Sequence, residues 1–131
     1  RPHTIWANPP YGKAENPCAV PCKKKTCFKR GHCIDEYLPG LDDWVHLFIS
    51  WQANGHTVVA LIPNATDAGW FRCLAETCHE IRLLSGRVEF VGGTSGNTGG
   101  NVLAIWRQGP RPEQAHIWLW DWRAELSDAV D

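Results

Sequence analysis

Four residues near the N-terminus combine a rigid backbone with groups that can grip a planar amine: Asn8, Pro9, Pro10 and Tyr11. Two successive prolines restrict the backbone, so the Asn8 amide and the carbonyl that follows it are fixed hydrogen-bond acceptors, and the Tyr11 ring is a flat stacking surface. An exocyclic amine is a poor nucleophile because its lone pair is delocalised into the ring. Two acceptors aimed at its N–H groups favour the pyramidal form that attacks a methyl donor. Taken alone, these residues fit a Pro-Pro turn with a buried tyrosine equally well.

A cluster of four cysteines is the second candidate site: Cys18, Cys22, Cys27 and Cys33, spaced C-x3-C-x4-C-x5-C. Cysteine clusters in a loop usually bind structural Zn²⁺, which would replace the core that this segment lacks. His32 is a substitute for Cys33 as a ligand. The spacing lacks a pair of C-x2-C knuckles, so two disulfides or plain buried thiols are the alternatives. Zinc is favoured because no secretion signal is present.

The same segment carries a patch of five positive charges: Lys23, Lys24, Lys25, Lys29 and Arg30. The whole chain has a formal net charge of -1, so no global field draws nucleic acid, and any contact with phosphates must come from a local patch. A solvated loop that its lysines keep soluble explains these residues about as well when they are taken alone.

Three weaker features lie in the rest of the chain. Asp67 follows a predicted strand and could orient a cofactor or substrate, although an acid there is more often in the first turn of a helix. The glycine-rich stretch 92–101 is either a mobile lid over a target base or a plain connection. Trp118, Trp120 and Trp122 are spaced two apart, so on a strand they would share one face and cover the sheet or a subunit contact.

The predicted elements place these candidates in an α/β fold. A length of 131 residues predicts one domain, in which residues 14–40 form a Cys- and Lys-rich insertion and residues 110–131 a Trp-rich tail. Strands are predicted at 3–8, 57–62, 80–84, 87–90 and 101–106, and helices from 42 to about 54 and from a Thr66 cap over about a dozen residues. The tail fits a strand or a helix. In such a sheet, chemistry lies beyond the carboxyl ends of the strands.

Composition excludes two classes of protein. Hydrophobic residues make up 44% of the chain and charged residues 21%, which is ordinary for a globular domain. The longest strongly apolar run, residues 57–63, is far shorter than the ~20 residues of a membrane-spanning helix. The chain is therefore expected to be neither a membrane protein nor a disordered tail.

Four blocks in order resemble the phage-type, Dam-like DNA N6-adenine methyltransferases: residues 5–12, 37–44, 59–71 and 80–90. The resemblance implies a Rossmann-like class I methyltransferase fold that methylates adenine N6 at specific sites in double-stranded DNA, with S-adenosylmethionine as donor, in the cytoplasm of a phage-infected or bacterial cell. It implies that Asn8 and the Pro9 carbonyl hold the adenine amine, while Tyr11 stacks on the flipped base. With this motif beside it, the basic patch becomes a candidate DNA contact.

The chain departs from that family pattern in one respect. The family places a glycine-containing cofactor loop and an acidic ribose ligand on strands before Asn-Pro-Pro-Tyr, and only seven residues precede the motif here. The segment 90–93 mimics a cofactor loop only weakly. Because the chain begins at Arg1 and has no Met, further residues are expected before it. We therefore expect a fold that lacks the cofactor-loop strands, and a chain that on its own binds the donor weakly. Its open sheet edge is expected to pair with a second copy or with an N-terminal half, unless the tail covers that edge.

Two other functions stay open at this point. One is a non-catalytic, zinc-stapled DNA-binding remnant of such an enzyme that keeps the adenine pocket. The other is a secreted, disulfide-rich domain that uses some of its eight tryptophans to bind carbohydrate.

Overall fold

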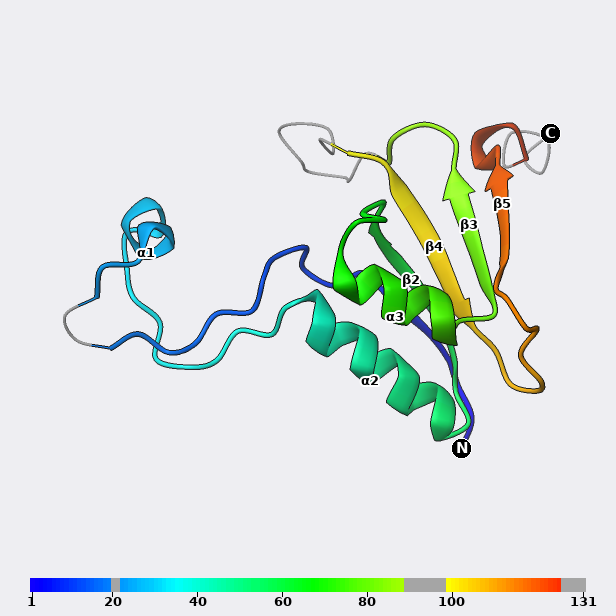
Figure 1. The fold of residues 1–131 in the computed structure, drawn as a ribbon, viewed down its shortest axis with the longest axis horizontal. Helices are drawn as coiled ribbons and strands as arrows, with labels where there is room; N and C mark the ends of the chain where they lie inside the picture. The colour runs from blue at the N-terminus through cyan, green and yellow to red at the C-terminus, as the bar shows by residue number, and fades with distance from the viewer. Residues whose placement is uncertain (20–21, 89–98, 126–131) are drawn as a thin grey trace.

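One mixed sheet organises the molecule (Figure 1). The computed structural model describes residues 1–19, 22–88 and 99–125. Its strands are β1 (Thr4–Ala7), β2 (Thr57–Pro63), β3 (Glu80–Leu84), β4 (Asn101–Trp106) and β5 (His116–Trp120), in the sheet order β1-β2-β4-β3-β5. The β1–β2 and β3–β5 pairs are parallel, and β4 is antiparallel to both its neighbours. The other four strands therefore end at the same edge of the sheet.

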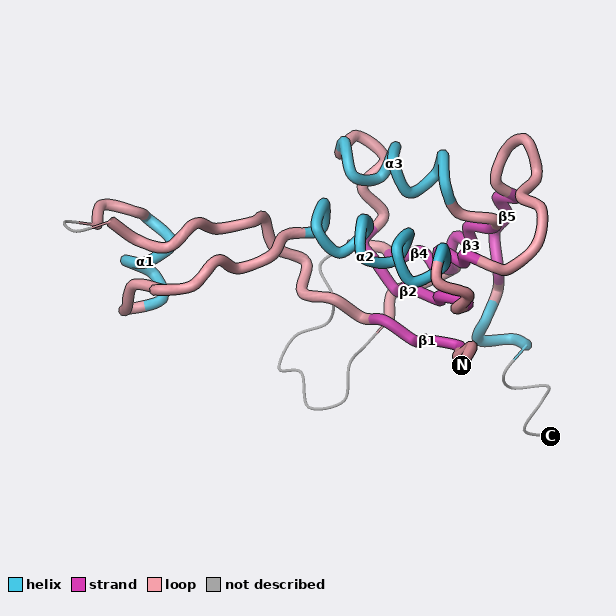
Figure 2. The backbone as a smooth tube through the Cα atoms, turned by 90° about the horizontal axis from the view of Figure 1, so that it is seen from below, coloured by secondary structure: helices cyan, strands magenta, loops and turns pink. Residues whose placement is uncertain are grey.

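Two helices cover one face of this sheet (Figure 2): α2 (Leu41–Ala53) and α3 (Gly69–Thr77). Strand side chains alternate between faces, and the helix-facing set of β2 and β4 is buried against the helices. The core comprises Val58, Ala60, Ile62, Val102, Ala104 and Trp106 from these strands, with Val45, Phe48, Phe71 and Leu74 from the helices. The predicted α/β class is thus confirmed, with a sheet that is mixed.

The insertion forms a separate projection, which we call the cysteine finger (residues 14–40). Its two arms are joined at the base by the backbone pairing of Glu15 with Leu38, at N–O distances of 3.0 and 2.9 Å. Figures 1 and 2 show its short helix α1 (Lys25–Arg30) far from the sheet. The finger begins after the motif that follows β1 and ends where α2 starts, so it projects from the carboxyl edge of the sheet.

Several expected element boundaries were wrong. Helix α3 begins at Gly69 after Ala68, and no side chain caps it, so Thr66 is not its cap. Arg87 and Val88 lie outside any strand, and residues 89 and 90 lie outside the described residues. In the tail, β5 places Trp118 and Trp120 on a strand, whereas Trp122 begins a short helical turn, so the three do not share one strand.

The remaining predicted strands and the first helix are confirmed within a residue or two. No helix among the described residues is long and apolar enough to cross a membrane.

Candidate functional site

The motif Asn8–Tyr11 lies at the carboxyl edge of the sheet, directly after β1. The register pairs Ala7 of β1 with Ala60 of β2, and Pro63 at the end of β2 with Asn101 at the start of β4. Because β4 runs opposite to β2, its first residue lies at the edge where β1 and β2 end. The topology therefore brings Asn101 to the motif across 90 residues of sequence.

Hydrogen bonds join Tyr11 to two strands, β2 and β4, and to Asn8. Asn101 Nδ2 donates to Tyr11 Oη at 3.0 Å and to the Ile62 carbonyl oxygen at 3.2 Å. Tyr11 Oη lies 3.1 Å from the Leu61 carbonyl oxygen and 3.2 Å from Asn8 Oδ1, and its single proton can go to either. Burial raises the pKa of Tyr11 by more than the hydrogen bond from Asn101 lowers it, so the phenol keeps its proton at neutral pH. Tyr11 is thereby a fixed donor beside the Asn8 amide.

The motif presents acceptors to solvent over a shallow hollow of about 350 Å³, lined by Asn8, Pro9, Pro10 and Tyr11. Asn8 is exposed, whereas Pro9 is buried and Tyr11 is half-buried. An amide oxygen has two lone pairs, so Asn8 Oδ1 can accept from Tyr11 and from a substrate amine at once. The arrangement can hold a planar amine at one end and a ring against it.

Asn101 is the residue of this site that the sequence did not reveal. Its side chain is buried, with 2% of the residue exposed, and it is the first residue of the apolar strand β4. A polar residue at the end of a strand is common, so this position does not stand out in the sequence. The one sequence signal for its role is an amide at the start of a strand that is otherwise apolar. A buried amide needs hydrogen-bond partners, so such a residue is expected to bond to neighbouring segments.

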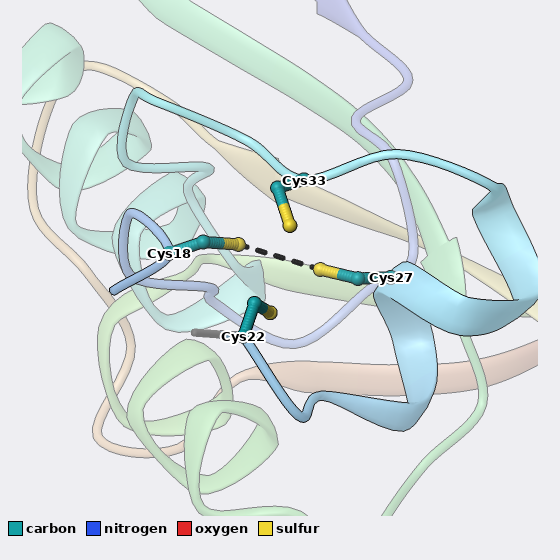
Figure 3. Close-up of side chains that lie close together, drawn as sticks. All are labelled: Cys18, Cys22, Cys27 and Cys33. Atoms are coloured by element: carbon teal, nitrogen blue, oxygen red, sulfur yellow. Dashed lines mark hydrogen bonds between the residues drawn. The ribbon is translucent and has the colours of Figure 1, made fainter. Parts of the chain in front are cut away.

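The four finger cysteines converge on one point (Figure 3). The sulfur atoms of Cys18, Cys22, Cys27 and Cys33 all lie within 4.8 Å of one another. A tetrahedral zinc site with Zn–S bonds of about 2.3 Å separates its sulfurs by about 3.8 Å, so small side-chain adjustments would seat an ion. The thiols are free, and Cys18 Sγ and Cys27 Sγ are 3.3 Å apart, longer than the ~2.05 Å of a disulfide. His32 is outside the cluster, and its Nδ1 lies 3.0 Å from the Cys33 carbonyl oxygen.

Hydrogen-bond donors surround the cluster as they do around metal-bound thiolates. The Ile34 N–H donates to Cys18 Sγ at 3.3 Å, which lowers the pKa of Cys18 to about 7. The Arg30 guanidinium donates to Cys27 Sγ at 3.2 Å, yet burial raises the pKa of Cys27 to about 12. Without a cation the cluster therefore ionises first at Cys18, and a bound metal would displace the other protons. The donor set fits Zn²⁺.

The basic residues of the finger fall into two groups. Arg30 faces inward, where it forms an ion pair with Glu15 at 3.2 Å and contacts Cys27. It is therefore a structural residue of the finger, not an outward contact. Lys24 is half-buried and donates to the Asn16 carbonyl oxygen. The exposed members of the predicted patch are Lys23, Lys25 and Lys29.

The expected donor-side residues do not gather at the motif. Asp67 is exposed in the turn between β2 and α3, and it lines neither hollow that Asn8 borders. Most of the predicted glycine-rich lid, residues 92–98, lies outside the described residues. The second hollow, about 450 Å³ on the sheet face opposite the helices, is lined by Trp6, Asn8, Leu61, Leu84, Val88, Leu103, Trp120 and Trp122. Neither lining contains an acid for a ribose, so the described residues around the motif suit a target amine better than S-adenosylmethionine.

The tail tryptophans are tied to the sheet by a charged network. Trp118 Nε1 donates to Glu80 Oε2 at 2.6 Å, and the Arg82 guanidinium lies 4.9 and 4.8 Å from the centroids of Trp118 and Trp120. Burial raises the pKa of Glu80, but hydrogen bonds from Arg107, Trp118 and Arg82 outweigh it and hold the pKa at about 2. This network fastens β5 to β3 and β4.

Comparison with known proteins gives one match. The sequence model of a family described as DNA N-6-adenine-methyltransferase (Dam) matches residues 1–119. That span includes the motif Asn8–Tyr11, the cysteine finger and Asn101. No curated protein and no solved structure matches the chain.

Proposed function

The chain belongs to the Dam family of DNA N6-adenine methyltransferases, which use S-adenosylmethionine, and from this membership we propose that it methylates adenine N6 in double-stranded DNA through Asn8–Tyr11. The observation that carries the proposal is the exposed Asn8 amide beside a tyrosine that two strands hold in place. Family membership and free thiols together argue against a disulfide-rich carbohydrate-binding domain.

In the proposed mechanism, the motif orients the amine of a flipped adenine. Asn8 Oδ1 and the Pro9 carbonyl oxygen each accept one N–H of the amine, which localises the nitrogen lone pair toward the methyl donor. The Tyr11 ring stacks on the base, and its hydroxyl keeps the Asn8 amide in one orientation. Because the prolines restrict this backbone before the base arrives, little ordering is required when it binds.

The finger supplies the DNA contact in this proposal. Zn²⁺ on Cys18, Cys22, Cys27 and Cys33 would hold a segment that has little apolar core of its own, and the outward lysines would meet phosphates. Four thiolates and Zn²⁺ carry a net charge of −2, and the five basic side chains of the finger are further offset by Glu15, Asp35 and Glu36. The metal-loaded finger is therefore neutral as a whole, and the exposed lysines form a local positive patch on it.

The donor side of the cleft is proposed to come from outside the described motif. Strand β1 lies at one edge of the sheet, so its outer backbone groups can pair with another strand. We propose that a second copy or an N-terminal half pairs there and brings the donor site. As a DNA-modifying enzyme, the chain would act in the cytoplasm of a bacterial or phage-infected cell.

The test is transfer of a labelled methyl group to unmethylated duplex DNA by the chain and by its Asn8→Ala variant. Loss of one preorganised acceptor is expected to lower turnover by about 10²- to 10³-fold, with DNA affinity nearly unchanged. Asn64→Ala removes an exposed amide at the same sheet edge and serves as the control. Equal rates for Asn8→Ala and the parent would show that the motif is only a turn. DNA binding without any methyl transfer, even when the donor-side partner is supplied, would instead favour the non-catalytic remnant.

A further inference from the structure

Phe28 occupies an unusual position in this molecule. It is 91% exposed on helix α1, whereas Phe48 and Phe71 are buried in the core. Full exposure forfeits roughly 1.5–3 kcal/mol of burial that a side chain of this kind can contribute to folding. Among the residues that the structure describes, none buries this ring.

The residues around Phe28 indicate what it meets. On a helix, positions i, i+3 and i+4 share a face, so Lys25, Phe28 and Lys29 point one way. The opposite side carries the buried Cys27 and Arg30, which contact each other and hold the finger together. An aromatic ring is therefore presented outward next to two exposed lysines.

The charge of this face selects a polyanion. Residues 22–34 contain no acidic side chain, and their exposed basic residues are Lys23, Lys25 and Lys29, whereas Lys24 and Arg30 are half-buried. Exposed lysines next to an apolar ring match a duplex, which offers phosphates at the rim of each groove and stacked bases between them. The hollow beside the ring, about 310 Å³, is also lined by three of the four clustered cysteines, so the ring stands at the rim of the metal site.

We propose that Phe28 is a DNA-contact residue that inserts its ring against the bases, while Lys25 and Lys29 bind neighbouring phosphates. Apolar side chains that enter a groove commonly wedge between base steps in this way. The inference rests on the proposed function, and it names a residue of the finger with a role separate from the motif. Since the finger projects from the carboxyl edge of the sheet, the contact falls on DNA flanking the target adenine (Figure 1).

The experiment is binding of the zinc-loaded chain to an unmethylated duplex of about 25 base pairs, measured by fluorescence anisotropy over a range of salt concentrations. Phe28→Ala should weaken binding about 5- to 150-fold, the range expected for loss of one stacked base, with the same slope of log affinity against log salt. The double variant Lys25→Gln, Lys29→Gln should reduce that slope by about 1.8. Phe28→Tyr should restore most of the affinity because it keeps the ring.

The matched control is Leu119→Ala, which removes another exposed apolar side chain, 69% exposed on β5. It should bind as the parent does. Zinc content and thermal unfolding of Phe28→Ala should match the parent, since the ring is 91% exposed and lies outside the hydrophobic core of the described residues. Parental affinity in Phe28→Ala, or a change in self-association in place of DNA binding, would overturn the inference. If that occurs while Asn8→Ala still abolishes methyl transfer, the proposed function stands; absence of any DNA binding by the parent would overturn both.

Discussion

Replacing Asn101 by alanine should cost both stability and activity, because this buried amide links the motif to the end of β2. Its Nδ2 donates to Tyr11 Oη at 3.0 Å and to the Ile62 carbonyl at 3.2 Å. Each bond contributes roughly 0.5–1.5 kcal/mol net, and a buried acceptor left without a donor costs more. We expect a loss of about 2 kcal/mol, which lowers the Tm of a chain of this size by about 6–10 °C.

The assay is urea unfolding of Asn101→Ala, Tyr11→Phe and the double variant. If the two side chains form one network, the cycle should show a coupling of about 1 kcal/mol. Methyl transfer by Asn101→Ala should fall about tenfold, equivalent to 1.4 kcal/mol, because Tyr11 and with it Asn8 lose their fixed geometry. Asn64→Ala, on an exposed residue at the same edge, should change stability by less than about 0.5 kcal/mol.

Two results would refute this reasoning. One is additive stability losses for Tyr11→Phe and Asn101→Ala within about 0.3 kcal/mol, the usual limit for independent sites. The other is parental methylation by an Asn101→Ala variant that is measurably destabilised, since this would separate the fold from the geometry of the motif.

Three more outcomes are expected. Protein purified without chelator should contain one Zn²⁺ per chain. The Cys27→Ser variant should lose this ion, whereas the control variant Cys73→Ser, changed on α3, should keep it. Metal-free parent protein, or disulfides among the four finger cysteines, would contradict the zinc site. Glu80 has a folded pKa of about 2 against 4.5 unfolded, so it should contribute about 3 kcal/mol above pH 4.5 that disappears as the pH falls toward 2. Glu80→Gln should lack that pH dependence, and identical unfolding profiles of variant and parent would exclude the network. In calorimetry the 131-residue chain alone should bind S-adenosylmethionine with a Kd above about 1 mM. Tight binding in calorimetry by a chain that light scattering shows to be a monomer would reveal a donor site elsewhere in the chain.

Local signals accounted for much of the secondary structure. The stripe of apolar residues at helical spacing predicted α2, and the continuous apolar run at 57–62 predicted β2, because each pattern is a property of neighbouring residues. The prediction of a Thr66 cap was wrong because Thr66 lies in a turn, closed by the Ala68 N–H donating to the Ala65 carbonyl oxygen, and α3 begins only after it, at Gly69. The tail could not be decided locally, because β5 exists only through its pairing with β3.

The sequence by itself determined the chemical identity of the two candidate sites. Asn8–Tyr11 are consecutive, and the four cysteines lie within sixteen residues, so short chain segments suffice to bring each set together. Only the tertiary structure decided that Asn101 holds Tyr11, that Arg30 faces the cysteines and that Phe28 faces solvent. The physical reason is that β4 runs antiparallel between β2 and β3, and strand order, register and burial depend on packing between distant segments that a local pattern does not encode.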